Sequence, residues 1–519
     1  MASEDISERD RAAANARSAV DRARKARQAE LLRSYQPLSG IADELMDTGG
    51  AIRPVWQRLV DHLAGLDAEA IHMRFSRGDQ YLRDAGVFYR QYGGEDTTER
   101  DWPLSHIPVL IDEDEWRQIA AGLIQRANLL EAIAADIYGD NQLVRNGYLP
   151  PSLIASNREW LRPLVGVRPR GGYFLHFVAF EIGRGPDGTW WVLGDRTQAP
   201  SGSGFALENR VATTRVFSDL FAQSNVHRLA GFFRAFRDAL LAQRANGDSR
   251  VGILTPGPLN DTYYEHAYIA RYLGFTLLEG EDLTVENGRV MVRTVAGLKP
   301  VSVLWRRLDA SWVDPLELDE RSHLGTPGLV GALRQGNLTM VNALGTGVLE
   351  TRALLAFLPR ICETLLGQPL ALPNIATWWC GQAAEREHVK ANAEKMTIDR
   401  ALSTRLPFET SNTAVIGGRM LGSRYPSLDA WIDAEGPQLI GQEAVTLSTT
   451  PAYEDGRLVP RPMSLRFFLA RTPEGWTVMP GGYARIGCTE DPTAIAMQNG
   501  GSAADVWVIA NHPVLVNHF

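Results

Sequence analysis

The first 150 residues show the hydrophobic spacing of helices. Apolar residues recur every three or four positions, as at Trp56, Leu59 and Leu63, which is typical of helices with one buried face. Residues 1–35 are instead rich in alanine and in charges of both signs, as in a solvated helix or a disordered arm. We therefore predict a flexible charged arm at 1–35 and a mainly helical region at 36–150.

The middle of the chain alternates between strand and helix patterns. Residues 173–193 contain two apolar runs separated by the turn sequence 185–188, which is typical of a β-hairpin. Beyond residue 250, short apolar runs alternate with helical segments, and this order predicts an open, mostly parallel sheet. We expect one unit at 151–249, which contains the hairpin, and a second, α/β unit at 250–384.

The last region, 385–519, combines a polar helix with several strands. A strand is predicted at 396–398, directly after that helix. Two longer strands, 439–447 and 462–470, are expected to be joined across a polar turn at 454–456. This set of strands predicts an antiparallel sheet, so the fold class of the whole chain is mixed α/β (α+β).

Composition and charge narrow the class of protein. A chain of 519 residues with 45% hydrophobic and 22% charged residues is an ordinary globular protein of more than one domain. Its net charge of −8 argues against nucleic acid as a partner, and no apolar run approaches the roughly 20 residues of a membrane span. The N-terminus lacks the apolar core of a signal peptide, and three widely spaced cysteines suit a reducing cytoplasm.

A polar loop follows the apolar run at 190–193. Asp195 and Arg196 come at the end of this strand, and a glycine-rich loop at 199–204 comes next. Backbone amides in such a loop can surround phosphate oxygens, and the alternative is a glycine-rich turn beside a solvated ion pair. The candidate ligand-binding residues of this stretch are Asp195, Arg196, Ser201, Gly202, Ser203, Gly204, Asn209 and Arg210.

Two acids are expected to face each other across the hairpin. Glu181 lies in its first strand and Asp195 at the end of its second. Carboxylate oxygens in this arrangement could hold a divalent cation, or they could form a solvated sheet edge. The metal hypothesis predicts that the two carboxylates lie at the same end and on the same face of one sheet.

The motifs 195–202 and 206–210 resemble the circularly permuted ATP-grasp family, type 2. The resemblance extends roughly over residues 40–510. It implies a circularly permuted ATP-grasp core similar to that of glutathionylspermidine synthetase, with a Rossmann-like pre-ATP-grasp region and an N-terminal helical region. Further blocks follow in the family's order: Tyr138-Gly139-Asp140, Leu161-Arg162-Pro163, Leu254-Thr255-Pro256-Gly257-Pro258, Arg306-Arg307-Leu308-Asp309, Asp314-Pro315-Leu316-Glu317-Leu318, Thr377-Trp378-Trp379-Cys380-Gly381, Gln442-Glu443, Pro460-Arg461-Pro462, Leu465-Arg466 and Met479-Pro480-Gly481-Gly482.

The resemblance implies an ATP-dependent carboxylate–amine ligase. Such enzymes use ATP and Mg²⁺ to phosphorylate a carboxylate, and an amine then attacks the acyl phosphate to form an amide. The implied substrate is a small molecule or a peptide. Family members are often fused to, or encoded beside, an alpha-E domain, so an alpha-E-type helical partner protein is expected.

The resemblance also suggests roles for individual residues. Glu181 and Asp195 would hold the metal. Arg306 and Arg307 end a strand, so we expect one of them to bind the transferred phosphate or the substrate carboxylate and the other to pair with Asp309 or Asp314. Arg306, Arg307 and Arg466 are the catalytic candidates, and Gln442, Glu443 and Arg461 join the glycine-loop residues as nucleotide-binding candidates.

Several charged positions depart from the family's pattern. The family's Glu-Asp-Asn motif reads Gly194-Asp195-Arg196 here, and Asp399 and Ala503 occupy positions where the family has lysine. We expect Asp399 to line the nucleotide cleft, so that Asp399→Lys would tighten ATP binding. The departures keep two alternatives beside the ligase: a catalytically degenerate scaffold that binds a nucleotide or a partner, and a phosphotransferase without ligation.

Overall fold

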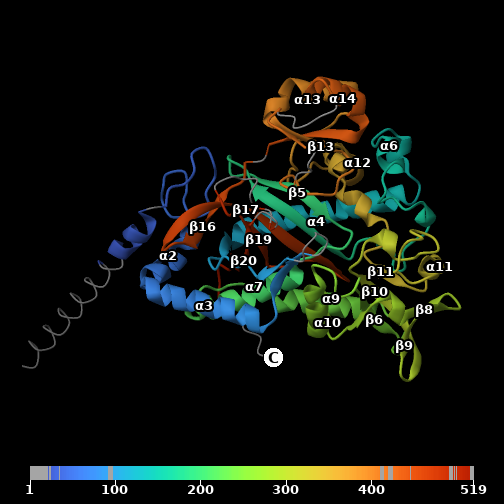
Figure 1. The fold of residues 1–519 in the computed structure, drawn as a ribbon, viewed down its shortest axis with the longest axis horizontal. Coiled ribbons are helices and arrows are strands. Elements are labelled where there is room, and N and C mark those ends of the chain that lie inside the picture. Colours follow the sequence, from blue (N-terminus) through green and yellow to red (C-terminus); the bar gives the residue numbers. More distant parts are fainter. Residues whose placement is uncertain are drawn as a thin grey trace, which may run out of the picture.

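The computed structural model describes residues 22, 25–33, 35–91, 98–409, 414–418, 425–444, 446–489, 495, 497 and 500–514. Within them the chain forms an eight-stranded, a six-stranded and a four-stranded sheet, together with a two-stranded ribbon (Figure 1). The eight-stranded sheet lies at the centre, and the six-stranded and four-stranded sheets lie at different sides of it. The predicted mixed α/β class is confirmed.

The central sheet draws its strands from both ends of the chain. Its order is β3-β20-β19-β17-β4-β5, with β16 and β18 also paired to β17. β3 and β20 run parallel, and the other pairs are antiparallel. The strands are β3 (Val109–Asp112), β4 (Phe177–Arg184), β5 (Trp190–Arg196), β16 (Thr449–Glu454), β17 (Arg457–Thr472), β18 (Gly475–Val478), β19 (Gly481–Ile486) and β20 (Ser502–Ile509).

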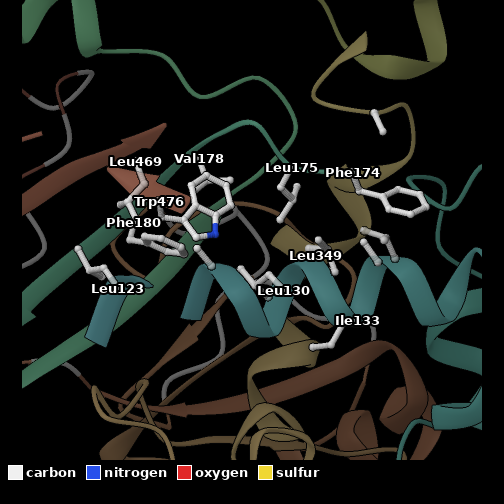
Figure 2. Packing of buried hydrophobic residues seen from close by; sticks show 14 of the residues in the cluster. Leu123, Leu130, Ile133, Phe174, Leu175, Val178, Phe180, Leu349, Leu469 and Trp476 are labelled. Atoms are coloured by element: carbon white, nitrogen blue, oxygen red, sulfur yellow. The ribbon is translucent and has the colours of Figure 1, made fainter. Parts of the chain in front are cut away.

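The two faces of the central sheet pack against different helices. Val178 and Phe180 of β4 point toward α4 (Glu113–Ile137), where they meet Leu123 and Leu130 (Figure 2). Residues between them, such as Phe177, point to the opposite face, which is covered by α7 (Ser203–Val216) and α9 (Ala230–Ala242). This alternation follows from the two-residue period of a strand, and it decides on which face each polar side chain lies.

The six-stranded sheet contains the predicted strand–helix–strand unit. Strands β6 (Arg250–Leu254) and β7 (Thr276–Leu278) are parallel and are connected through α10 (Tyr263–Leu273). β10 (Gly297–Arg306) runs parallel to both β6 and β11 (Thr339–Val341), and its first half pairs antiparallel with the hairpin β8 (Leu283–Glu286) and β9 (Arg289–Thr294). The parallel sheet predicted for this region is therefore confirmed.

The four-stranded sheet forms a small antiparallel layer with α13 and α14, which stands apart from the central sheet in Figure 1. Its order is β12-β15-β13-β14. The C-terminal strands were expected to form one set, but β15 belongs to this small sheet, and the turn at Asp455-Gly456 joins β16 to β17 instead. The elements are β12 (Thr377–Trp379), α13 (Ala383–Asn392), β13 (Met396–Arg400), β14 (Val415–Ile416), α14 (Leu428–Glu435) and β15 (Leu439–Glu443).

The N-terminal region is mainly helical, as predicted, although its strand β3 joins the central sheet. The other α-helices are α2 (Gln57–Ala64), α3 (Ala68–Asp84), α5 (Gln142–Arg145), α6 (Pro151–Ala155), α8 (Ser218–Gln223), α11 (Leu329–Arg334) and α12 (Leu358–Leu366), and the ribbon is β1 (Phe88–Gln91) with β2 (Thr98–Asp101). Short 3₁₀ helices are η1 (Pro54–Trp56), η2 (Arg162–Leu164), η3 (Gly280–Asp282), η4 (Ala310–Trp312), η5 (Thr346–Glu350), η6 (Arg352–Ala356), η7 (Ala393–Lys395) and η8 (Gly436–Gln438). Among the helices described, none has the length and apolar character needed to cross a membrane.

Candidate functional site

A buried carboxylate, Glu181, lies at the centre of the sheet face that is turned away from α4. It accepts hydrogen bonds from Arg466 Nε at 2.8 Å and Ser464 Oγ at 3.2 Å, and its other contact is the guanidinium of Arg485. Burial lowers the pKa of Arg466 and brings that of Arg485 to about 10, so both guanidinium groups stay positively charged at neutral pH. The oxygens of Glu181 are therefore already bound by the protein's own cations.

Asp195 lies on the other face of the sheet. Its carboxylate pairs with both ends of the Arg126 side chain of α4, at 2.6 Å to Nε and 2.8 Å to Nη2, and both side chains are buried. The prediction that Glu181 and Asp195 lie together on one face is wrong. The cause is a bulge in β5: Val192 pairs with Ile182 but Gly194 pairs with Glu181, and the extra residue moves Asp195 to the opposite face.

The bulge also decides which side chains accompany Glu181. Gly194 lies directly opposite Glu181 and brings no ligand atom, and Arg196, two residues further, brings a third cation to this face. Among the residues that the structure describes, no three His, Cys, Asp or Glu side chains are grouped as metal ligands. Glu181 does not fit Mg²⁺, which needs several oxygen ligands, because its carboxylate is surrounded by guanidinium groups.

The glycine-rich loop holds a carboxylate of the protein itself. Gly202 N donates to the two carboxylate oxygens of Glu265 at 2.8 and 3.0 Å, Gly204 N donates at 2.9 Å, and Ser203 Oγ lies at 3.3 Å. Gly202 has φ of 111°, a conformation that favours glycine. The loop is an anion cradle, as its sequence predicts, but Glu265 of α10 fills the place that we had expected for phosphate.

Both members of the Arg306–Arg307 pair are held inside the protein. Arg306 is fully buried, donates to the carbonyl oxygens of Leu308 at 2.8 Å and Asn342 at 3.2 Å, and has its pKa lowered by burial to about 10. Arg307 donates to Pro200 O at 2.7 Å and lies 3.7 Å from Glu265. The carboxylate of Asp314 accepts backbone N–H groups, including that of Val330, whereas the charge of Asp309 acts on Arg306 and opposes the lowering of its pKa. A pairing with Asp314 is therefore not formed, and the ligand contact expected for one of the two arginines stays a prediction.

Three further nucleotide-binding candidates connect parts of the fold. Arg210 pairs with Asp505 at 2.7 Å and donates to Val506 O, which fastens α7 to β20. Asn209 accepts a hydrogen bond from Trp102 Nε1 at 2.9 Å. Arg461 pairs with Glu454 across the β16–β17 hairpin. These contacts give each side chain a structural role, and the ligand contacts expected from the sequence stay predictions.

Two further candidates, Arg196 and Gln442, also contact other residues of the protein. Arg196 lies between Glu350, at 3.4 Å, and Glu409, at 3.7 Å. Gln442 donates to Thr377 Oγ1 at 3.0 Å between neighbouring strands of the small sheet. Each of these side chains is therefore engaged by the protein.

The two positions where the family has lysine carry no cation. Asp399 is buried in β13 and pairs with Arg352 Nη1 at 2.7 Å. Ala503 is buried in β20, opposite Arg485 of β19. The guanidinium beside Asp399 thus belongs to Arg352, and Asp399 neutralises it.

An apolar slot lies between the β4–β5 turn and the end of β15. Its volume is about 280 Å³. The backbone of β15 runs along one side, where Glu443 N donates to Ala376 O and Ala444 N donates to Lys395 O. Glu443 was predicted from the sequence, and the other lining residues were not: Gly185, Pro186, Asp187, Trp191, Leu193, Ile375, Ala376, Ala444 and Thr446.

A second cavity, of about 210 Å³, lies beside Glu181 and its arginines. Ser201, Gly202 and Arg466, three of the predicted site residues, line it together with Arg485 and Glu409. The rest of the lining is mostly aromatic: Phe88, Tyr89, Trp102, Phe205 and Tyr483, with Arg90, Asp261, Thr262 and Met497. Sequence reasoning missed the aromatic residues because they come from segments far apart in the chain.

The side chain of Glu159 lies close to two other acidic residues, Asp309 and Glu350. Burial, followed by these two like charges, raises the pKa of Glu159 from its ordinary value of 4.5. Because the folded protein favours the neutral acid, the contribution of Glu159 to stability is complete below pH 4.5 and is lost as the pH rises through the raised value. Ionisation of Glu159 is therefore less favourable in the folded protein than in the unfolded chain.

Replacing Glu159 by glutamine is expected to raise the melting temperature at pH 7, because glutamine stays neutral at every pH. The difference from the wild type should shrink as the pH falls and vanish below about pH 4.5. Thermal melts between pH 4 and pH 8 measure this, with Glu363→Gln on the exposed side of α12 as the control. A gain that is independent of pH would show that repulsion among these acids is not its cause.

The fold is that of the ATP-grasp class. It combines the parallel strands of the six-stranded sheet with the small antiparallel sheet, and a slot lies between the small sheet and the β4–β5 turn. The chain belongs to the circularly permuted ATP-grasp type 2 family, whose model matches residues 108–487. The fold-level expectation from the sequence is thereby confirmed.

The chain is also similar to several bacterial proteins described as uncharacterized. One from Mycobacterium tuberculosis is 33% identical over 476 residues, covering 90% of this chain and 53% of the relative, so the chain spans about half the length of that protein. A second from the same species is 32% identical, covering 90% of this chain and 84% of the relative. One from Synechocystis is 30% identical, covering 92% of this chain and 98% of the relative.

A solved structure shares the fold. It is a glutathione synthetase-like effector from Globodera pallida in its apo form, with a TM-score of 0.50 and 11% sequence identity over 86% of this chain and 97% of that chain. The likeness supports the ATP-grasp architecture of the chain.

Proposed function

We propose that this protein binds an adenine nucleotide in the slot beside β15 and has no metal centre for phosphoryl transfer. It is then a nucleotide-binding ATP-grasp scaffold, the alternative that the departures from the family's motifs favour. The observation that carries the proposal is the saturation of Glu181, the expected metal ligand, by Arg466, Arg485 and Ser464.

The slot supports the base-binding part of the proposal. Trp191, Leu193 and Ile375 supply apolar contact, and the side chains of Glu443 and Thr446 supply polar groups at one edge. A purine needs this combination, since its faces are apolar and its edge carries hydrogen-bonding nitrogens. The volume of about 280 Å³ is small for a whole nucleoside triphosphate, so the phosphates would extend out of the slot.

The ion pairs around the cleft support the second part of the proposal, the absence of a centre for phosphoryl transfer. Arg466 and Arg485 adjoin Glu181, Arg196 adjoins Glu350 and Glu409, and Arg352 adjoins Asp399. A triphosphate would have to compete with these carboxylates for every guanidinium group. Binding should therefore depend on the base more than on the phosphates.

Calorimetry is expected to show that ATP binds with nearly the same Kd in excess EDTA as in Mg²⁺, the two differing by less than about threefold. AMP should bind about as well as ATP, because the phosphates contribute little. Trp191→Ala should raise the Kd of both nucleotides about tenfold, because contact in the slot is lost. Trp160 lies outside the slot, so Trp160→Ala should leave both Kd values unchanged. Binding that requires Mg²⁺ or the γ-phosphate would overturn the proposal.

The second candidate is the ATP-dependent carboxylate–amine ligase, with amide formation through an acyl phosphate. Membership of the ATP-grasp family favours it, and Arg466 and Arg485 reach a cavity that could hold a carboxylate. Its signature would be release of ADP and phosphate that requires both a carboxylate and an amine. Incubation with ATP, Mg²⁺ and pools of amino acids tests this, and such turnover would replace the scaffold by the ligase.

A further inference from the structure

The second cavity has a positive end, where two arginines meet one carboxylate. Arg466 and Arg485 share the single carboxylate of Glu181, and both side chains reach the cavity wall although each is more than nine-tenths buried. Arg466 is further fixed by its hydrogen bond to Ser201 O at 2.9 Å. Two rigid guanidinium groups around one acid leave room for a second anion, and a carboxylate matches their geometry.

A negative group faces the same cavity. The Glu409 side chain is 23% exposed, accepts from Leu406 N at 3.2 Å and lies 3.7 Å from Arg196. Its interaction with Arg466 opposes the lowering of the Arg466 pKa, which shows that it lies close to the positive end. The cavity therefore offers an acceptor for a cation next to its donors for an anion.

The remaining wall is aromatic. Trp102 stacks on Phe205 with ring centroids 4.3 Å apart and an angle of 9° between the planes, and Tyr483 meets Trp102 edge-on at 6.3 Å. Trp102 is held in place by its hydrogen bond to Asn209. Such a surface binds an apolar or aromatic group through area and ring contacts.

We propose that this cavity binds a single α-amino acid with an aromatic or large apolar side chain. The carboxylate would meet Arg466 and Arg485, the ammonium would meet Glu409, and the side chain would lie along Trp102 and Phe205. The volume of about 210 Å³ is below the roughly 300 Å³ at which pockets for drug-sized ligands begin, which suits a ligand of this size. The site is separate from the slot, so it stands whether or not the slot binds a nucleotide.

Calorimetry with L-phenylalanine, 3-phenylpropanoate and phenethylamine tests the proposal. L-phenylalanine should bind best, and each analogue, which lacks one charged group, should bind at least about tenfold more weakly. Adding AMP should leave L-phenylalanine binding unchanged, because the two cavities have different linings. Absence of L-phenylalanine binding, or equal binding of all three compounds, would overturn the proposal.

Two variants separate the charged contacts. Glu409→Gln should weaken the binding of L-phenylalanine by about tenfold, because the contact with its ammonium group is lost. The binding of 3-phenylpropanoate, which has no ammonium group, should not change. Glu363→Gln, the same change on the exposed side of α12, should alter neither. The double variant Glu181→Gln/Arg485→Gln keeps the net charge of the buried cluster. It should weaken the binding of both L-phenylalanine and 3-phenylpropanoate, because each binds through its carboxylate. Thermal melts confirm that each variant folds, and a folded Glu409→Gln protein that binds like the wild type would refute the assignment.

Discussion

Replacing Arg126 by methionine is expected to lower the free energy of unfolding by about 3–5 kcal/mol. The change removes both hydrogen bonds that Asp195 receives, at 2.6 and 2.8 Å, and leaves its carboxylate buried between α4 and the central sheet. An uncompensated buried charge has a large desolvation penalty, whereas methionine still fills most of the volume. Chemical denaturation followed by circular dichroism measures the loss.

The matched control is the double variant Arg126→Met/Asp195→Leu, which removes the pair completely. It should recover most of the stability, because an apolar pair needs no desolvation of charge. The same experiment tests where Asp195 acts: the single variant should lose stability while its nucleotide affinity, measured below the unfolding transition, stays unchanged. A loss below about 1 kcal/mol, the value for an exposed pair, would contradict the burial of this ion pair.

Replacing Asp399 by lysine is the second change with a large expected effect, and it reverses the expectation drawn from the sequence. In the structure the lysine would lie against Arg352, so two cations would be buried where one ion pair stood at 2.7 Å. The expected loss of stability is about 3–5 kcal/mol, with no gain in ATP affinity.

Two comparisons test this expectation. Arg400→Lys changes the neighbouring residue, whose partly exposed side chain pairs with Glu435, and should cost less than about 1 kcal/mol. Asp399→Lys/Arg352→Asp exchanges the two charges and should recover part of the stability. If Asp399→Lys folds normally and binds ATP more tightly, Asp399 faces the nucleotide cleft after all.

Local pattern predicted the elements well, because each depends on neighbours in the sequence. The hairpin at Gly185-Pro186-Asp187-Gly188 forms where expected, and the strand–helix–strand order after residue 250 produces a parallel sheet. Which strands meet could not be predicted in the same way. The partners of β15 and β3 are decided by packing across the whole chain, and no local period records that information.

The candidate site shows the same limit at the scale of single atoms. Glu181 and Arg466 were identified from their motifs, but one bulged residue in β5 moved Asp195 to the other face. The glycine loop was identified as an anion cradle, yet the same backbone amides suit phosphate and carboxylate equally, so its occupant, Glu265, was not predictable from the loop. Arg485 and Glu409 belong to no predicted motif and become visible only as neighbours of Glu181 and Arg466.

The parallel pairing of β3 with β20 has a consequence for synthesis at the ribosome. Residues 109–112 can pair with residues 502–509 only after about 400 further residues have been synthesised, so this edge of the central sheet forms late. Until then, the nascent chain carries α4 and the β4–β5 hairpin with their apolar faces incompletely covered, which makes folding slow and aggregation a competing outcome. Stalled chains that end before residue 502 should therefore be sensitive to protease in the α4 region and should associate with chaperones, and both properties should disappear once β20 has left the exit tunnel.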